Sequence, residues 1–240
     1  MKKRELELGG VPALLFGEAS ERLFLSVHGK MGRKEEAEPF ALTATELGWQ
    51  VLSVDLPEHG ARRDSGKLDP WHVLPELQKV YDQAANQWRS ISLYGVSIGA
   101  WFSLLALAER KVDRCLLVSP VLDMEKLIET MLGWAGATAE QLRQQRRIPT
   151  SFGETLDWDY YCFARENPVR WRKDTRMLYA GRDHLTPRST AEDFCRRFGW
   201  ALTVMEEGEH WFHTGEQLSV LRRWEREQLE SFSGTGVEKV

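Results

Sequence analysis

Apolar stretches of strand length alternate with segments of helical periodicity along most of this sequence. Two short apolar runs on either side of Gly9-Gly10 predict a hairpin. With six later runs they predict eight strands, at 6–8, 11–16, 23–27, 51–54, 91–94, 115–118, 177–180 and 202–205. Apolar residues spaced by three and four predict helices at 37–47, 71–88 and 98–109, and a final helix from Thr214. This alternation is typical of an α/β fold with a mostly parallel sheet and helices on both faces.

One long segment, at about 121–173, departs from this alternation. It contains no clear strand, a weak helical pattern at 124–132 and a cluster of aromatic residues. A long insertion between two strands of a compact domain is usually a functional lid or cap. We therefore expect a single domain over 1–240 that carries one cap insertion. The Ser/Gly-rich tail from Ser231 is expected to fray.

The strongest chemical signal is Gly95-Val96-Ser97-Ile98-Gly99, which lies between a predicted strand and a predicted apolar helix. A serine on a sharp strand-to-helix turn needs small residues on both sides, because the backbone is tight and the helix packs close. Such a turn lifts the hydroxyl above the sheet edge and points the helix N-terminus at the reacting centre. The pattern predicts a nucleophile elbow at Ser97, with a purely structural Gly/Ser turn as the alternative.

A serine hydroxyl is a weak nucleophile unless a base takes its proton and a third group orients that base. Asp183 and His210 each follow a predicted strand, so both are expected on loops at the carboxyl edge of the sheet, where catalytic groups gather. Asp123 is an alternative acid after an earlier strand, and His213 is an alternative base. We favour Ser97, Asp183 and His210, because nucleophile, acid and base then follow the order expected for this architecture.

Acyl transfer also needs donors for the oxyanion that develops on the carbonyl oxygen. One donor is expected from the backbone N–H after the nucleophile, here Ile98, and the other from the loop after the third strand. In that loop the N–H of Lys30 is the expected donor, with that of Met31 next. The basic group of Lys30, Arg33 and Lys34 could attract an anionic substrate, but a charged helix start on the surface is the favoured interpretation.

Together these motifs resemble those of the α/β-hydrolase family of serine hydrolases. The matching motifs run in order over most of the chain: His28-Gly29, Asp55-Leu56-Pro57-Glu58-His59-Gly60, Gly95-Val96-Ser97-Ile98-Gly99, Gly181-Arg182-Asp183 and Gly208-Glu209-His210. The family often has Gly where Glu58 stands here. The resemblance implies an α/β-hydrolase fold and a Ser97–His210–Asp183 triad that hydrolyses a carboxylic ester or a related acyl bond. It implies no metal and no organic cofactor.

The resemblance leaves the bond and the substrate open. The same fold and triad cleave amides, peptides and thioesters, and the family includes lyases and carbon–carbon bond hydrolases. A non-catalytic binding protein is a further alternative. The aromatic cap indicates a pocket for a small to medium apolar or aromatic group, although the same aromatic residues could form the interior of the cap. The candidate pocket residues are Met31, Trp134, Trp158, Tyr161 and Trp211.

Composition adds limits on partners and on location. Hydrophobic residues make up 42% of the chain, which is enough for a buried core, and the net charge of −4 without a basic stripe does not suit nucleic acid. The longest charge-free apolar stretch, 98–108, is too short to cross a bilayer. No apolar run follows the positive residues at the start, and the three cysteines form no C-x-x-C pair. We expect a cytoplasmic protein with reduced thiols, as a monomer or a homodimer.

Overall fold

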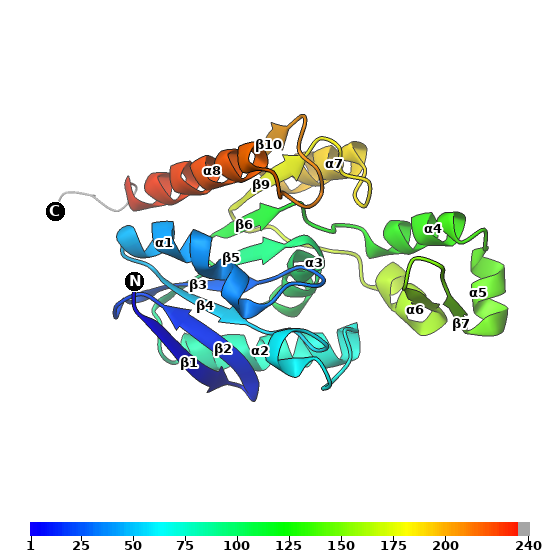
Figure 1. The fold of residues 1–240 in the computed structure, drawn as a ribbon, viewed down its shortest axis with the longest axis horizontal. Coiled ribbons are helices and arrows are strands. Elements are labelled where there is room, and N and C mark those ends of the chain that lie inside the picture. Colours follow the sequence, from blue (N-terminus) through cyan, green and yellow to red (C-terminus); the bar gives the residue numbers. More distant parts are fainter. Residues whose placement is uncertain (235–240) are drawn as a thin grey trace.

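An eight-stranded sheet forms the centre of the computed structural model, which describes residues 1–234 (Figure 1). The strand order is β1-β2-β4-β3-β5-β6-β9-β10. The strands are β1 (Lys3–Leu8), β2 (Val11–Phe16), β3 (Arg22–Val27), β4 (Gln50–Val54), β5 (Ser90–Val96), β6 (Cys115–Val118), β9 (Thr175–Ala180) and β10 (Ala201–Met205). β2 pairs antiparallel with β1 and β4, and all other neighbours are parallel. The prediction of a mostly parallel eight-stranded sheet is confirmed.

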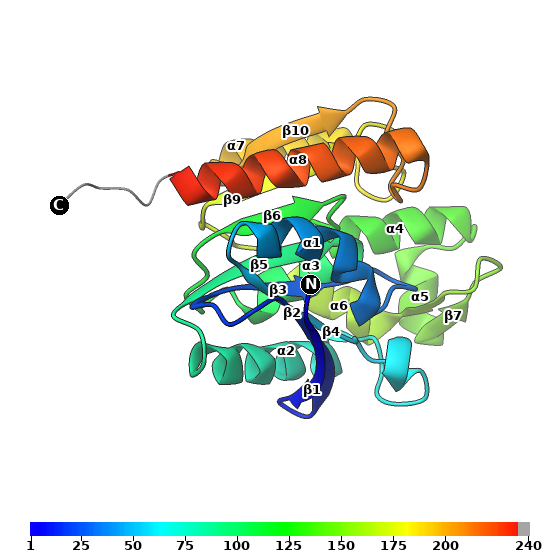
Figure 2. The ribbon, with the colours of Figure 1, turned by 60° about the vertical axis from the view of Figure 1, so that its left-hand side comes forward.

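The inner strands of the sheet are largely buried on both faces because their side chains alternate between two cores, whereas the edge strands β1 and β10 are partly exposed. Leu23, Leu25 and Val27 of β3 belong to one apolar cluster, and Phe24 belongs to the other. Figure 2 shows α1 (Glu38–Glu46) and α8 (Gly215–Gly234) together on the face that carries Phe24. The opposite face is covered by α2 (Pro70–Ala85), α3 (Ser97–Ala106) and α7 (Arg188–Phe198). Helices on both faces leave the two ends of the sheet as the places where loops can form a site.

Between β6 and β9 the chain leaves the sheet and forms a cap, residues 124–166, beyond the carboxyl ends of the strands (Figure 1). The cap contains α4 (Met124–Trp134), α5 (Ala139–Gln145), β7 (Arg147–Pro149), β8 (Thr155–Asp157) and α6 (Trp158–Glu166). The expectation of no clear strand in this segment is wrong, because β7 and β8 pair as an antiparallel hairpin. Each strand has three residues, which is too short for alternation of apolar and polar positions to reveal it.

Aromatic contacts attach α6 to the helices beneath the cap. The ring of Trp101 in α3 lies 5.8 Å from that of Tyr160 and 6.4 Å from that of Phe163. Trp71 of α2 lies 5.8 Å from Phe163. Part of the aromatic cluster noted in the sequence is therefore the interface between the cap and the sheet domain.

The last helix, α8, begins directly after Thr214, whose hydroxyl accepts the N–H of Gln217 at 3.2 Å. It continues past Ser231, where the tail was expected to fray, as far as Gly234, and the remaining tail residues lie outside the described part of the chain. Within residues 1–234, no helix combines the length and the apolar character needed to span a bilayer.

Candidate active site

Ser97 lies on a strained turn where β5 ends and α3 begins. Its φ is 50°, in the left-handed region that costs a non-glycine residue roughly 1–2 kcal/mol. The flanking glycines make this turn possible. A Cβ on Gly95 would lie 2.9 Å from Cα of Ala100, and one on Gly99 would lie 2.1 Å from the carbonyl oxygen of His28. The start of α3 therefore packs directly against the end of β3, and Ser97 lies at the carboxyl edge of the sheet.

Hydrogen bonds link the side chain of Ser97 to two further side chains. Ser97 Oγ lies 2.8 Å from Nε2 of His210, and Nδ1 of His210 lies 2.7 Å from Oδ2 of Asp183. The side chain of Asp183 is fully buried, and its Oδ1 accepts the N–H groups of Leu185 at 2.7 Å and Thr186 at 3.0 Å. A carboxylate that accepts on both oxygens receives the Nδ1 proton of the imidazole, which leaves Nε2 free to accept the serine proton.

The two alternative residues make contacts elsewhere. Asp123 caps the start of α4, where its Oδ1 accepts the N–H of Lys126 at 3.0 Å. His213 is exposed, and its Nδ1 lies 2.7 Å from the carbonyl oxygen of Trp211. The structure thus brings Ser97, Asp183 and His210 together, and it uses Asp123 as a helix cap.

The expected oxyanion donors lie beside Ser97. Ile98 is the second residue of α3, where a backbone N–H has no partner within the helix. A Cβ on Gly29 would lie 3.1 Å from Cβ of Ser97, so the loop after β3 passes close to the serine. Within residues 1–234 the N–H of Lys30 has no hydrogen-bond acceptor, whereas that of Met31 donates to Nε2 of His59 at 2.8 Å. Of the two candidates in this loop, only Lys30 has a free N–H.

The basic group near this loop is not a set of free surface charges. The side chain of Lys30 forms an ion pair with Glu154 at the turn of the β7–β8 hairpin. Lys34 is largely buried, with Nζ 2.8 Å from Oδ2 of the fully buried Asp55, so the surface interpretation is wrong for Lys34. Burial alone would lower the pKa of Lys34, but the hydrogen bonds that its ammonium group donates to Asp55 and Glu35 raise the pKa above its ordinary value. This cation holds two loops together.

The predicted pocket residues divide into two groups. Met31, Trp134 and Trp211 are 88%, 48% and 76% exposed, whereas Tyr161 is buried. The rings of Trp158 and Tyr161 lie 5.6 Å apart, and the hydroxyl of Tyr161 donates to Glu129 of α4 at 2.9 Å. For Trp158 and Tyr161 these contacts favour the alternative, which placed them in the interior of the cap.

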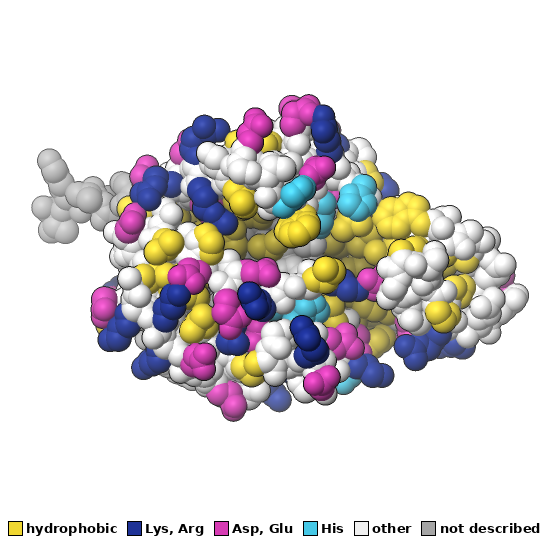
Figure 3. Space-filling view, in the orientation of Figure 1, with side chains coloured by type: hydrophobic (Ala, Val, Ile, Leu, Met, Phe, Trp, Pro, Cys, Tyr) yellow, Lys and Arg dark blue, Asp and Glu magenta, His cyan; other side chains and the backbone are white. Residues whose placement is uncertain are grey.

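One exposed aromatic residue near the site escaped the sequence reasoning. Phe152 lies in the turn of the β7–β8 hairpin, 40% exposed, with its ring 5.9 Å from that of Trp134. Trp134 in turn lies 6.2 Å from His184, and His184 lies 6.2 Å from His210. In Figure 3 hydrophobic side chains gather between the histidines and the cap. An aromatic residue in a polar turn has no periodic signal, so only the fold brings Phe152 to this place.

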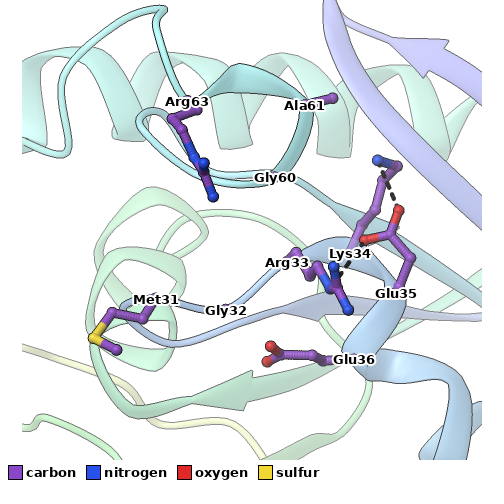
Figure 4. A pocket seen from close by; sticks show the side chains of 9 residues that line it. All are labelled: Met31, Gly32, Arg33, Lys34, Glu35, Glu36, Gly60, Ala61 and Arg63. Atoms are coloured by element: carbon purple, nitrogen blue, oxygen red, sulfur yellow. Dashed lines mark ion pairs between the residues drawn. The ribbon is translucent and has the colours of Figure 1, made fainter.

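Two adjoining hollows of about 470 Å³ each are lined by the loop after β3 and the loop after β4. One contains Arg33, Glu36 and Arg63 and is shown in Figure 4; the other is lined by His59 and Leu68 among others. Neither hollow is lined by Ser97 or His210. The hollows therefore border the loop that carries the Lys30 N–H.

No protein-family model matches this chain, and no curated protein matches it in sequence. Solved structures match over nearly its whole length. Est1E from Butyrivibrio proteoclasticus, solved with ferulic acid, has a TM-score of 0.73 at 17% identity over 95% of this chain and 98% of its own. Alpha/beta hydrolase domain-containing protein 10 from mouse has a TM-score of 0.74 at 12% identity, over 97% of this chain and all of its own (100%).

A third solved structure gives a similar result. A soluble variant of monoglyceride lipase from Saccharomyces cerevisiae, in complex with a substrate analogue, has a TM-score of 0.64 at 11% identity. It covers 96% of this chain and 94% of its own. Identities this low establish a shared fold, and the reaction has to be argued from the side chains of this chain.

Proposed function

We propose that this chain, which has the α/β-hydrolase fold, is a serine hydrolase that cleaves a carboxylic ester through an acyl-enzyme on Ser97. The observation that carries the proposal is the hydrogen-bonded series Ser97 Oγ, His210 Nε2 and Asp183 Oδ2, with links of 2.8 and 2.7 Å. A nucleophile, a base within reach of its proton and a group that orients the base are the parts that acyl transfer needs.

In the proposed reaction His210 takes the proton of Ser97 as the hydroxyl oxygen attacks the ester carbonyl. The carbonyl oxygen gains negative charge, and the N–H groups of Ile98 and Lys30 are the proposed donors to it. His210 then gives its proton to the departing alcohol, which leaves the acyl group on Ser97. A water molecule deprotonated by His210 releases the acid in the second half of the reaction.

The environment of Asp183 supports this division of roles. Its two backbone N–H donors bind Oδ1 and fix the orientation of the carboxylate, so that Oδ2 faces Nδ1 of His210. A buried anion beside Nδ1 stabilises the imidazolium that forms when His210 accepts the serine proton. Ser97 is the first residue of α3, and the N-terminus of this helix favours negative charge at the same place.

The exposed apolar residues around the site support an apolar substrate. Met31, Trp134, Phe152 and Trp211 come from four different segments of the chain, and each is at least 40% exposed. Exposed apolar side chains that gather at one place usually mark a binding surface. The similar structures include Est1E with bound ferulic acid and a monoglyceride lipase with a substrate analogue, which agrees with an ester that carries an apolar or aromatic group.

The test is covalent labelling with a fluorophosphonate probe, followed by mapping of the modified residue by mass spectrometry. We expect labelling at Ser97 and turnover of p-nitrophenyl esters, both lost in Ser97→Ala, while Ser189→Ala on the exposed surface of α7 behaves as wild type. Labelling should also fail in His210→Ala, because the hydroxyl then has no base. A folded wild-type chain that neither labels nor hydrolyses esters would overturn the proposal and favour a binding protein.

A further inference from the structure

Two loops at the carboxyl edge of the sheet are joined by a reciprocal pair of histidines. His28, in the loop after β3, accepts the N–H of Leu56 on Nε2 at 3.1 Å. His59, in the loop after β4, accepts the N–H of Met31 on Nε2 at 2.8 Å. The two rings lie 5.2 Å apart. Each loop thus supplies one imidazole that receives a backbone N–H of the other.

The partners of the other ring nitrogens indicate the tautomer of both histidines. Nδ1 of His28 lies 2.7 Å from the carbonyl oxygen of Gly29, and Nδ1 of His59 lies 2.7 Å from that of Pro57. A carbonyl oxygen only accepts and a backbone N–H only donates, so each ring carries its proton on Nδ1 and accepts on Nε2. This tautomer leaves Nε2 of His59 as the acceptor of the Met31 N–H.

The N–H of Met31 lies one peptide from the proposed oxyanion donor. Gly29 packs against Ser97 on one side of Lys30, and Met31 is tied to His59 on the other. Met31 has a φ of 63°, a conformation that a non-glycine residue holds only when its surroundings impose it. The Lys30 N–H is therefore placed by two fixed neighbours, and His59 provides one of these fixed points.

We propose that His59 is a positioning residue for the hydrolysis: by accepting the Met31 N–H, it holds the Lys30 N–H where the oxyanion forms. This inference rests on the proposed function. His59 itself touches neither Ser97 nor the reacting carbonyl. Its effect is on a donor that matters most in the transition state, because the substrate oxygen gains its full charge only there.

A second link between the same loops allows His59 to be changed without separating them. Oδ1 of Asp55 accepts the N–H of Lys34 at 2.8 Å, and its Oδ2 accepts Nζ of Lys34 at 2.8 Å and the N–H of Ala61 at 3.0 Å. Asp55 is fully buried. These bonds remain in a His59 variant, so the loops are expected to stay together while the Lys30–Met31 segment is no longer held.

The experiment compares His59→Ala, His59→Leu and His59→Gln in the full chain, with the exposed His72→Ala as the control. Loss of one oxyanion donor lowers kcat by about 100-fold to 1,000-fold, and a misplaced donor should cost less, about 10-fold to 100-fold. We expect this loss in kcat for His59→Ala and His59→Leu, with little change in KM. His59→Gln should recover most of it, because the glutamine amide oxygen can accept the Met31 N–H. Affinity for a trifluoromethyl ketone, which forms an oxyanion on the serine, should fall in parallel with kcat.

Several results would overturn the inference. If His59→Ala and His59→Leu had the same kcat as the wild-type chain, the loop would keep its position without the imidazole. A loss that appears in KM alone, or one that His59→Gln does not recover although it folds, would assign His59 a different role. Failure of the wild-type chain to hydrolyse esters or label at Ser97 would instead overturn the proposed function, and the inference with it.

Discussion

The carboxyl edge of the sheet and the cap lie on opposite sides of the same site, and they are built in opposite ways. At the sheet edge, backbone approaches backbone so closely that a single added carbon at Gly99 would lie 2.1 Å from the His28 carbonyl oxygen. In the cap, a Cβ on Gly133 of α4 would meet nothing within 4 Å. Charges differ in the same way: Lys34 and Asp55 form a buried pair, whereas Arg143 and Glu140 of α5 form an exposed one.

This difference suits two different tasks. Groups that stabilise charge in a transition state act best when they are fixed before the reaction, which requires buried partners and tight packing. A surface that receives the apolar part of a substrate needs area more than exact placement, and Trp134 and Phe152 offer area on the cap. We therefore expect substitutions at the sheet edge to have large effects and comparable substitutions in the cap to have small ones.

The largest contrast is expected between two aspartates at the ends of neighbouring strands. Asp183→Asn should lower kcat by about 10,000-fold, because the amide no longer holds the His210 tautomer or stabilises the imidazolium. Asp123→Asn should leave kcat within about twofold, because asparagine caps a helix as well as aspartate does. Steady-state kinetics with one p-nitrophenyl ester measures both. A large loss in Asp123→Asn with a small one in Asp183→Asn would move the acid to the loop after β6.

A second contrast compares two glycines in helices. Gly99→Ala in α3 should lower the free energy of unfolding by about 3 kcal/mol or more, because the carbonyl groups of Val27 and His28 leave no room for a methyl group. Gly133→Ala in α4 should raise it by about 0.5–1 kcal/mol, since alanine loses less backbone entropy in a helix. Urea denaturation measures both changes. Equal changes in unfolding free energy at the two positions would mean that the sheet edge accommodates an added methyl group as easily as the cap does.

The strands of the sheet and the loops at its edge could be predicted from the sequence. β3 and β5 are rich in apolar residues and buried along most of their length, and few folds other than a parallel sheet covered by helices accommodate such strands in alternation with helices. The loops that follow such strands meet at one edge, which is why Asp183 and His210 could be placed near Ser97 although Asp183 lies 86 positions after Ser97.

Other features escaped prediction because they depend on single distant partners. The burial of Lys34 requires Asp55, 21 positions later, and a lysine in a charged segment otherwise indicates a surface. The β7–β8 hairpin consists of three-residue strands with no resolvable alternation. Whether Tyr161 lines a pocket or packs inside the cap depends on its contacts with Trp158 and Glu129, which periodicity does not reveal.

A smaller effect concerns pH. Burial lowers the pKa of His28 from 6.5 to about 4, so the folded chain keeps this ring neutral where the unfolded chain binds a proton. The free energy of unfolding should fall as the pH drops from about 6.5 towards 4, by up to about 3 kcal/mol from this group, and no further below its folded pKa. The cap contains no histidine, so this loss arises at the sheet edge alone.

Urea denaturation of wild type and His28→Gln at several pH values isolates this contribution. The difference in unfolding free energy between the two chains should change across pH 4 to 6.5 and stay constant above it. The exposed His72→Gln serves as the control and should follow wild type throughout. Parallel curves for wild type and His28→Gln would show that this ring does not weaken the sheet edge in acid.

The smallest effect is expected where the two regions touch, at the ion pair between Lys30 and Glu154. Their side chains are 45% and 33% exposed, and exposed pairs contribute at most about 1 kcal/mol because water and salt screen them. Glu154→Gln should therefore change kcat by less than about threefold, with any difference from wild type vanishing at high salt. Glu140→Gln, which breaks an exposed pair within α5, is the matched control. A tenfold loss of kcat in Glu154→Gln but not in Glu140→Gln would mean that the cap helps to place the Lys30 N–H. The cap would then share with the sheet edge the task of positioning the groups that stabilise the transition state.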